Sequence, residues 1–265
     1  MSSEEDRLER LDLLREGERA VAVGDIIKVL YDGHGLAWGT DSYLLAAFLR
    51  PAERMCELGC GSGVVSFLAS AHGKAEKIVA FEMNRASCSR AARGVTFNRL
   101  EHRVDVFLRD VREVRPTDAE CGGRFDTVFA NPPYVSHPGT RRADAEADDA
   151  RHENNGGIAD FCAAAARLLK HRGRFACVFR PDRLGDLFSA MRNAKIEPKT
   201  LIPVFPDPGS SCSLVLCEGV LGGGPGLSVL HPLFIYPARR DGKREYTEDY
   251  SRIYSECSFD GVYPR

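Results

Sequence analysis

Four consecutive residues, Asn131, Pro132, Pro133 and Tyr134, could act together on a planar group that carries an NH2. The Asn131 amide oxygen and the Pro132 backbone carbonyl oxygen are acceptors that match the two hydrogens of such an amino group. The Tyr134 ring could stack on the face of the same group. The structural alternative is a strand that ends in a proline-stiffened turn, because turn residues at strand ends are ordinary.

The six residues before this motif predict the element that positions it. The run Phe-Asp-Thr-Val-Phe-Ala at residues 125–130 is short and mostly apolar, which is typical of a buried parallel strand. The two prolines end the strand, since neither has an N–H to donate and the first keeps Asn131 out of the α region. Asn131 and Tyr134 are therefore expected at the carboxyl end of a strand, the edge where open α/β sheets bind ligands.

A glycine-rich loop, Glu-Leu-Gly-Cys-Gly-Ser-Gly at residues 57–63, separates a predicted strand from a predicted helix. Its glycines, Gly59, Gly61 and Gly63, let the backbone approach a ligand, and the next helix offers free N–H groups at its start. A dinucleotide fingerprint has the spacing Gly-x-Gly-x-x-Gly, but here Val64 stands where its third glycine belongs. This spacing, with the acidic Glu57 at the start, favours S-adenosylmethionine over NAD.

Acidic residues end the next two predicted strands. The strand at residues 77–82 ends in Glu82, nineteen positions after Gly63, where nucleoside-binding folds place the carboxylate that binds the ribose hydroxyls. The strand at residues 104–108 is followed by Asp110, which could accept a hydrogen bond from the amino group of a cofactor's adenine. Each acid alone could be a turn residue, but ligand-type groups after successive strands make coincidence a poor explanation.

The remaining elements complete an alternation of strands and helices. A strand at residues 26–30 precedes a helix that ends near residue 49, and Thr40 or Asp41 is most simply the N-cap of this helix. A helix at residues 158–172, strands at 174–179 and 213–217, and a helix at 182–193 follow. This order predicts an α/β fold with a doubly wound, Rossmann-like parallel sheet, helices on both faces and an antiparallel edge.

The ends of the chain predict smaller additions to one domain. Residues 4–20 are charge-rich with periodic leucines, so we expect residues 1–25 to be an N-terminal helical extension. Residues 26–250 are expected to form the main domain and residues 251–265 a C-terminal tail. The polar run at residues 140–155 predicts a flap over the site, with a solvated charged face as the alternative.

Composition limits the possible partners. The chain has 36 Lys and Arg against 38 Asp and Glu, a net charge of −2, so a nucleic acid would have to contact a local basic patch. Nine scattered cysteines fit a reducing compartment, and no cysteine pair has the second pair that a zinc finger needs. No apolar run approaches the roughly 20 residues of a membrane span. We expect a cytoplasmic protein with no metal and no membrane segment.

These motifs resemble the class I S-adenosylmethionine-dependent methyltransferases that modify exocyclic amino nitrogens. The narrower resemblance is to the bacterial methyltransferases of the adenine next to the anticodon in the valine-accepting tRNA. It rests on Gly-Thr-Asp at 39–41, Arg-His-Glu at 151–153, Arg-Pro-Asp-Arg-Leu at 180–184 and Glu-Tyr-Thr at 245–247, and covers most of residues 20–250. The Asn-Pro-Pro-Tyr motif is also shared with DNA adenine, rRNA guanine and protein glutamine methyltransferases, which remain alternatives.

The resemblance implies S-adenosyl-L-methionine as the cofactor, tRNA as the partner and a role for each motif residue. Cofactor contacts are implied for Glu57, Gly59, Gly61, Gly63, Glu82, Asp110 and Asn131. Asn131 and the Pro132 carbonyl would hold the target amino group while Tyr134 stacks on the flipped base. Substrate contacts are expected from Thr40, Asp41, Arg151 and Arg183, and further arginines at 85, 90, 93, 141 and 142 are candidates for RNA contacts.

Two rival functions are weaker. Protein glutamine methyltransferases that act on a release factor resemble this chain, but they look preceded by a helical domain. The roughly 55 residues before Gly59 are too few for an ordinary domain. A non-catalytic nucleoside- or RNA-binding module is the rival from another class, and the intact Asn131 and Tyr134 speak against it.

Overall fold

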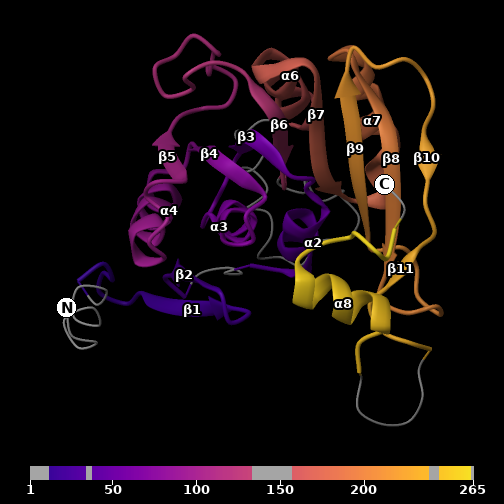
Figure 1. Ribbon diagram of the computed structural model, residues 1–265, viewed down its shortest axis with the longest axis horizontal. Helices are drawn as coiled ribbons and strands as arrows, with labels where there is room; N and C mark the ends of the chain where they lie inside the picture. Colours follow the sequence, from indigo (N-terminus) through magenta and orange to yellow (C-terminus); the bar gives the residue numbers. More distant parts are fainter. Residues whose placement is uncertain (1–11, 34–37, 133–156, 239–244, 264–265) are drawn as a thin grey trace, which may run out of the picture.

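The computed structural model describes residues 12–33, 38–132, 157–238 and 245–263, and these ranges form a layered α/β structure (Figure 1). A two-stranded hairpin, β1 (Arg19–Val23) and β2 (Ile27–Tyr31), lies near the N-terminus. The main sheet contains β3 (Ala52–Leu58), β4 (Ala75–Glu82), β5 (Val104–Leu108), β6 (Phe125–Ala130), β7 (Leu169–Phe179), β8 (Ile196–Phe205), β9 (Leu214–Leu221), β10 (Ser228–Val229) and β11 (Leu233–Phe234). The helices are α2 (Thr40–Phe48), α3 (Val64–Ala71), α4 (Arg85–Phe97), α6 (Ile158–Leu168), α7 (Leu184–Asn193) and α8 (Glu248–Glu256), with a short 3-10 turn, η1 (Pro181–Arg183).

The main sheet is the predicted doubly wound, mostly parallel sheet. Its strands lie in the order β10-β8-β9-β7-β6-β3-β4-β5, and β11 also pairs with β8. The pairs β3–β4, β3–β6, β4–β5 and β6–β7 are parallel, while β9 is antiparallel to both β7 and β8. The antiparallel strand therefore lies inside the late half of the sheet instead of at its rim.

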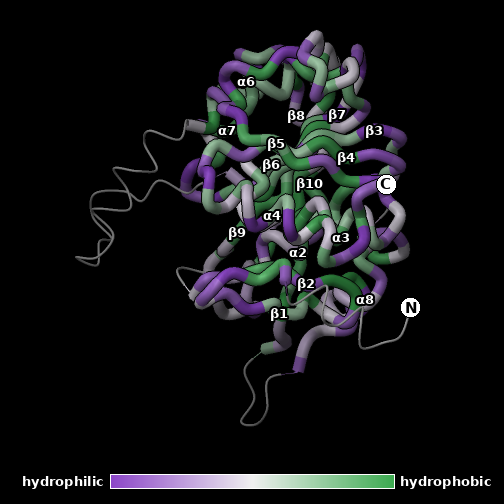
Figure 2. Tube along the Cα trace, turned by 90° about the vertical axis from the view of Figure 1, so that its left-hand side faces the viewer, coloured by the Kyte–Doolittle hydropathy of each residue, from purple (hydrophilic) through white to green (hydrophobic). Residues whose placement is uncertain are grey.

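Two hydrophobic clusters pack the helices onto opposite faces of this sheet, as predicted. One cluster joins α2, α3, α4 and α8 to the sheet through residues such as Phe48, Phe67 and Ile253. The other joins α6 and α7 through residues such as Phe161 and Met191. Apolar residues follow the central strands, and polar residues gather on the outer turns (Figure 2). The alternating side chains of each strand thus fill two cores, as expected for strands buried on both faces.

Helix α8 packs along α2, so the chain returns near its end to an element formed near its start. The Tyr43 hydroxyl donates a hydrogen bond to the Tyr254 backbone carbonyl at 2.6 Å, and the two rings stack with centroids 4.4 Å apart. At the other end of α2, Phe48 contacts Phe259 edge to face, with centroids 5.7 Å apart. The boundary expected at residue 250 therefore falls inside a helix that is packed against the main domain.

The predicted N-terminal helix is wrong for the part of the chain that the structure describes. Residues 1–11 lie outside the described ranges, residues 12–18 form turns, and residues 19–23 are strand β1. Every residue of β1 pairs with β2, and the buried Val29 of β2 joins the core beneath α3 and α4. Pairing with a neighbouring strand, which is not visible in leucine spacing, decided the conformation.

Helix α6 and strand β8 also differ from the sequence prediction. Helix α6 ends at Leu168 instead of residue 172, because Leu169 already pairs with Phe125 in the sheet. Strand β8 was not predicted. Its two prolines, Pro198 and Pro203, read as strand breakers, but β8 has a full-length partner only in β9, and prolines are tolerated on such strands.

No helix in the described ranges is long and apolar enough to cross a membrane.

Candidate active site

The carboxyl ends of β3, β4, β5 and β6 meet along one edge of the sheet. The register pairs Leu58 with Ala130 and Glu82 with Leu108, so the loops that follow these strands start side by side. In chain order β4 and β5 lie on one side of β3 and β6 lies on the other, so the strand order switches between β3 and β6. We call this the ligand edge, because ligands of open α/β sheets bind at such a switch point.

The glycine loop is tied to the end of β4. The Gly61 N–H donates to Oε2 of Glu82 at 2.8 Å, and the Asn84 N–H donates to Oε1 at 2.7 Å. Gly61 has a φ of +55°, and no atom lies within 4 Å of the position that a Cβ would take there. Neighbouring side chains therefore do not explain this glycine, whereas its left-handed backbone does, and the open space beside it leaves room for a ligand. The loop and Glu82 fit S-adenosylmethionine.

Glu57 lies buried beneath this loop. It is 1% exposed, and its Oε2 accepts hydrogen bonds from the backbone N–H of Ser66, at 3.1 Å, and from the Ser66 hydroxyl. Burial raises the pKa of Glu57 to about 8, an effect that the Ser66 hydrogen bonds oppose and the nearby Glu82 carboxylate reinforces. The acid at the head of the loop therefore fastens β3 to α3.

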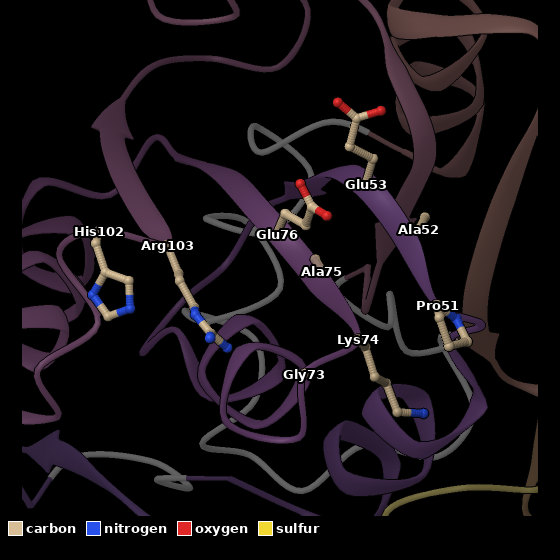
Figure 3. A pocket seen from close by; sticks show the side chains of 9 residues that line it. All are labelled: Pro51, Ala52, Glu53, Gly73, Lys74, Ala75, Glu76, His102 and Arg103. Atoms are coloured by element: carbon tan, nitrogen blue, oxygen red, sulfur yellow. The ribbon is translucent and has the colours of Figure 1, made fainter.

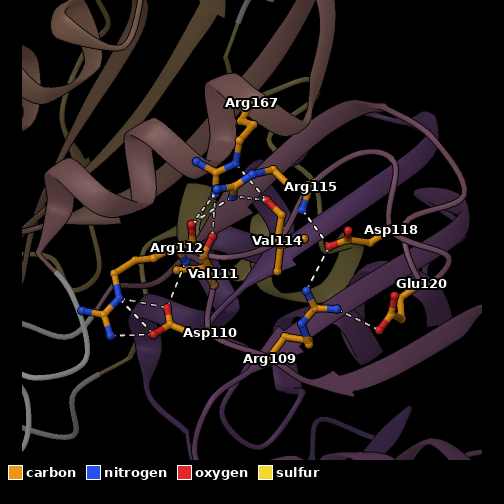
Figure 4. Close-up of polar contacts among 9 residues, drawn as sticks. All are labelled: Arg109, Asp110, Val111, Arg112, Val114, Arg115, Asp118, Glu120 and Arg167. Atoms are coloured by element: carbon orange, nitrogen blue, oxygen red, sulfur yellow. Dashed lines mark hydrogen bonds and ion pairs between the residues drawn. The ribbon is translucent and has the colours of Figure 1, made fainter.

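Asp110 follows β5 as predicted and is paired with an arginine (Figure 4). Its oxygens accept from the Arg112 backbone N–H at 2.9 Å and from Nη2 of the same residue at 2.5 Å. The hydrogen bonds from Arg112 hold the pKa of Asp110 below its usual value. The segment around it is fixed by Arg167 of α6, which donates to the carbonyls of Val111 and Val114.

Two apolar side chains at the ligand edge were missed by sequence reasoning. Met83 directly follows Glu82, Leu108 ends β5 two residues before Asp110, and each is 37% exposed. Exposed apolar side chains beside polar ones are typical of pockets that hold a planar ligand. Their signal in the sequence is an apolar residue at or just beyond a strand end, next to an acid.

Asn131 lies at the carboxyl end of β6, and helix α2 holds its side chain. The Nδ2 group donates to Oδ2 of Asp41 and to the hydroxyl of Ser42, each at 3.2 Å. Neither Thr40 nor Asp41 is the N-cap, since that position belongs to Gly39. Thr40 is the first helical residue, and its side chain bonds Tyr250 of α8. Ser42 was not predicted at all.

The remaining predicted residues are distributed as follows. Pro132 is buried directly after Asn131, while Tyr134 and Arg151 lie outside the described residues. Arg183 follows the end of β7, and its Nε donates to Asp186 of α7 at 2.8 Å. Two of the arginines considered for RNA are engaged in ion pairs near the N-terminal hairpin, Arg90 with Asp32 and Arg93 with Glu18.

A hollow of about 600 Å³ lies at the opposite edge of the sheet (Figure 3). It is lined by Pro51, Ala52, Glu53, Gly73, Lys74, Ala75, Glu76, His102 and Arg103. These residues precede the strands β3, β4 and β5 or begin them. The hollow therefore lies at the amino ends of these strands, and the ligand edge lies at their carboxyl ends. We call this the opposite edge.

The sheet order, the glycine loop and the acids after successive strands are those of a Rossmann-like methyltransferase that uses S-adenosylmethionine, as predicted. Residues 37–193 match the family described as "Methyltransferase small domain", and the chain belongs to that family.

Named relatives and solved structures agree with this assignment. The chain is 24% identical over 184 residues to the tRNA1(Val) (adenine(37)-N6)-methyltransferase of Bacteroides fragilis strain ATCC 25285, covering 69% of this chain and 76% of the relative. It is 29% identical over 163 residues to the protein of the same name from Serratia proteamaculans, covering 60% and 61%. A solved structure described as a predicted O-methyltransferase, protein Atu636 from Agrobacterium tumefaciens, is similar with a TM-score of 0.66 at 20% identity, covering 83% of this chain and 97% of that one. P. horikoshii TYW2 in complex with MeSAdo is similar with a TM-score of 0.54 at 14% identity, covering 79% and 73%. At these identities the solved structures show a shared fold.

Proposed function

We propose that this protein transfers a methyl group from S-adenosylmethionine to the exocyclic amino nitrogen of an adenine in tRNA, next to the anticodon. The observation that carries the proposal is the hydrogen bonding of Asn131, whose Nδ2 is taken up by Asp41 and Ser42. Because the Nδ2 end faces Asp41 and Ser42, the oxygen is the end of the amide that can act as an acceptor for an NH2 group. The names of the Bacteroides and Serratia relatives support the choice of tRNA adenine as the substrate.

The chemical task of Asn131 and Pro132 is to raise the reactivity of a poor nucleophile. The lone pair of an adenine amino nitrogen is delocalised into the ring. Acceptors for both of its hydrogens, the Asn131 Oδ1 and the Pro132 carbonyl, favour the pyramidal nitrogen whose lone pair can attack. The bound cofactor supplies the methyl group, and the methylated nitrogen then loses one proton to water, so the chain needs no strong base. Holding the reactants in such a geometry can lower a barrier by about 7–11 kcal/mol.

The cofactor would bind along the ends of β3, β4 and β5. Glu82 would accept hydrogen bonds from the ribose hydroxyls, and the backbone at Gly61 would approach the methionine portion. Met83 and Leu108 would flank the adenine, and Asp110 would accept from its amino group. Asp110 would then share its oxygens between Arg112 and the cofactor.

The proposal is tested by incubating the protein with methyl-labelled S-adenosylmethionine and unmodified tRNA, with a release factor as a parallel substrate. The labelled RNA is then digested to nucleosides. We expect label in N6-methyladenosine and none in the release factor. Label in the release factor would instead assign the glutamine chemistry, and label in another nucleoside would overturn the choice of adenine.

A further inference from the structure

We propose that Asp41 and Ser42 are positioning residues for methyl transfer, because they fix which end of the Asn131 side-chain amide faces the substrate. The inference rests on the proposed function, since it assigns a role within the same site. Asp41 and Ser42 would touch neither the base nor the methyl group. They would act through Asn131, from the N-terminus of α2.

The two ends of the Asn131 amide differ only in whether they donate or accept. Oδ2 of Asp41 lies 3.2 Å from Nδ2 of Asn131, and the Ser42 hydroxyl lies 3.2 Å from the same atom. An ionised carboxylate can only accept, so the NH2 end of Asn131 must face it. If the amide turned by half a rotation, its oxygen would face the Asp41 carboxylate and its NH2 would face the NH2 of the substrate. Asp41 excludes that orientation.

The Asp41 carboxylate is itself fixed. Its Oδ1 accepts from the backbone N–H of Ser42 at 2.8 Å, which sets the plane of the group at the start of α2. A Cβ at Gly39 would lie 2.6 Å from this oxygen, closer than real Cβ atoms come to a neighbour, so any other residue there would displace the Asp41 carboxylate. Gly39, Asp41 and Ser42 therefore form a local device that presents acceptors to Asn131.

Helix α2 is a rigid support for this device. Seven of its nine residues, from Ser42 to Phe48, are buried. The side chain of its first residue, Thr40, bonds Tyr250 of α8. At its other end, Lys74 donates hydrogen bonds to the backbone carbonyls of Ala47 and of Leu49, the residue after the helix. A side chain that must be held in one orientation for catalysis is best held from such an element.

The alternative role for Asp41 is structural, since an acid in the first turn of a helix interacts favourably with the helix dipole. Asp249 provides a matched control, because it is the second residue of α8 as Asp41 is the second residue of α2. Asp249→Asn thus makes the same change of charge at the same helix position. A structural role predicts similar small effects of Asp41→Asn and Asp249→Asn, on stability alone.

The first test measures kcat, KM for tRNA and Kd for S-adenosylmethionine in Asp41→Asn and Asp249→Asn. An asparagine at position 41 can offer its own NH2 to Asn131 and so permits the wrong amide orientation. We expect Asp41→Asn to lower kcat at least about tenfold, in line with the sensitivity of near-attack geometry to small misplacements. Kd for the cofactor should stay within about twofold, and Asp249→Asn should match the wild type. Parallel loss of kcat and cofactor binding in Asp41→Asn would overturn the proposal.

The second test exchanges the two side chains. Asn131→Asp alone sets two carboxylates against each other across the 3.2 Å contact and should be nearly inactive. Adding Asp41→Asn restores a donor–acceptor pair and leaves one oxygen at position 131 turned to the substrate. We expect the double variant to have at least about ten times the kcat of Asn131→Asp. A double variant no more active than Asn131→Asp would overturn the proposal.

Failure of this inference can be told apart from failure of the proposed function. Circular dichroism and cofactor binding show whether each variant is folded, independently of turnover. A wild type that binds the cofactor but methylates no tRNA would refute the proposed function. An active wild type whose Asp41→Asn variant is equally active would refute only the positioning role.

Discussion

The two ends of helix α2 are held by different kinds of contact. At the ligand edge, Asp41 and Ser42 accept hydrogen bonds from a side chain, Asn131 of β6. At the opposite edge, the ammonium group of Lys74 donates to the backbone carbonyls of Ala47 and Leu49, at 2.7 and 2.8 Å. The first contact orients a side chain, whereas the second satisfies carbonyls that a helix end leaves without partners.

This difference teaches that polar contacts at the two edges of the sheet have different consequences: at one edge they set the orientation of a side chain, and at the other they stabilise the end of a helix. The hollow of about 600 Å³ lies at the opposite edge, where Lys74, 6% exposed, closes a helix (Figure 3). At the ligand edge, groups from separate elements hold one another: the Gly61 backbone N–H contacts Glu82, and Asp41 contacts Asn131. We therefore expect substitutions at the two edges to affect different quantities.

The largest effect is expected at the ligand edge. Asn131→Ala removes one acceptor for the target amino group, so we expect a loss of about 3 kcal/mol in transition-state stabilisation, or about 100-fold in kcat/KM, by analogy with the removal of an oxyanion-hole donor. Steady-state kinetics with tRNA measures the loss, and calorimetry should show unchanged cofactor affinity. Equal losses of turnover and cofactor binding would contradict the role of Asn131.

A change at the opposite edge should show the reverse pattern. Lys74→Met leaves the carbonyls of Ala47 and Leu49 without their donor in a buried place, which should lower the free energy of unfolding by about 2–3 kcal/mol. Urea unfolding measures this, and kcat at low temperature should change little. Lys77→Met, on the half-exposed pair with Asp105, is the control and should cost under 1 kcal/mol. A Lys74→Met protein that is as stable as the wild type but inactive would contradict the purely structural role of Lys74.

Glu57 sharpens the comparison because it lies beneath the ligand edge but is predicted to act on stability. Its pKa is about 8 in the folded chain against an ordinary value of 4.5, so the folded state keeps a proton that the unfolded chain releases. Its contribution to stability is complete below about pH 4.5 and is lost as the pH rises through 8. Glu57→Gln should therefore remove about 2 kcal/mol of the stability change between pH 5 and 7. Melting curves of the wild type and Glu57→Gln across this pH range test the prediction. If the two proteins show the same dependence of stability on pH, the proton that the folded state keeps is not on Glu57.

The smallest effect is expected at the contact between α4 and the segment just before the N-terminal hairpin. Arg93 donates from Nη1 and Nη2 to the two oxygens of Glu18, at 2.5 and 2.8 Å, and these hydrogen bonds lower the pKa of Glu18 to about 2. The contribution is present above about pH 4.5 and is lost as the pH falls towards 2. Glu18→Gln should cost about 1 kcal/mol at pH 7 and almost nothing near pH 2. A cost that is the same at both pH values would show that charge is not the cause.

The parallel half of the fold was predictable because its strands carry their own signals. Residues 125–130 and 104–108 are short apolar runs with polar residues after them, and the structure places β6 and β5 at these positions. Strand β8 was missed because its two prolines look like breakers until it is known that the pairing on its second side, with β10 and β11, falls at residues 200–201 and 204–205 and so avoids both prolines. The strand β1 at residues 19–23 was also missed, because it is stabilised by pairing with β2, which the sequence of residues 19–23 alone does not show.

The candidate site was predictable as a set of positions but not as a set of contacts. Strand ends identified Glu82, Asp110 and Asn131, since carboxyl ends of parallel strands share an edge. The partners of Asn131 lie about 90 positions earlier in the chain, at a helix start that has ordinary capping residues. Only the packing of α2 beside the sheet brings them together. The burial of Glu57 likewise depends on how α3 covers β3.

The hydrogen bond from Tyr43 to Tyr254 bears on how the protein is made, because it joins residues 211 positions apart. A ribosome adds about 5–20 residues per second, so roughly 10 to 40 s separate the synthesis of Tyr43 in α2 from the synthesis of Tyr254 in α8. During that time the sheet strands β3 to β6 can already be complete, while the helix that supports Asn131 lacks its outer layer. A nascent chain would thus complete strands β3 to β6 well before helix α2 gains its contact with α8.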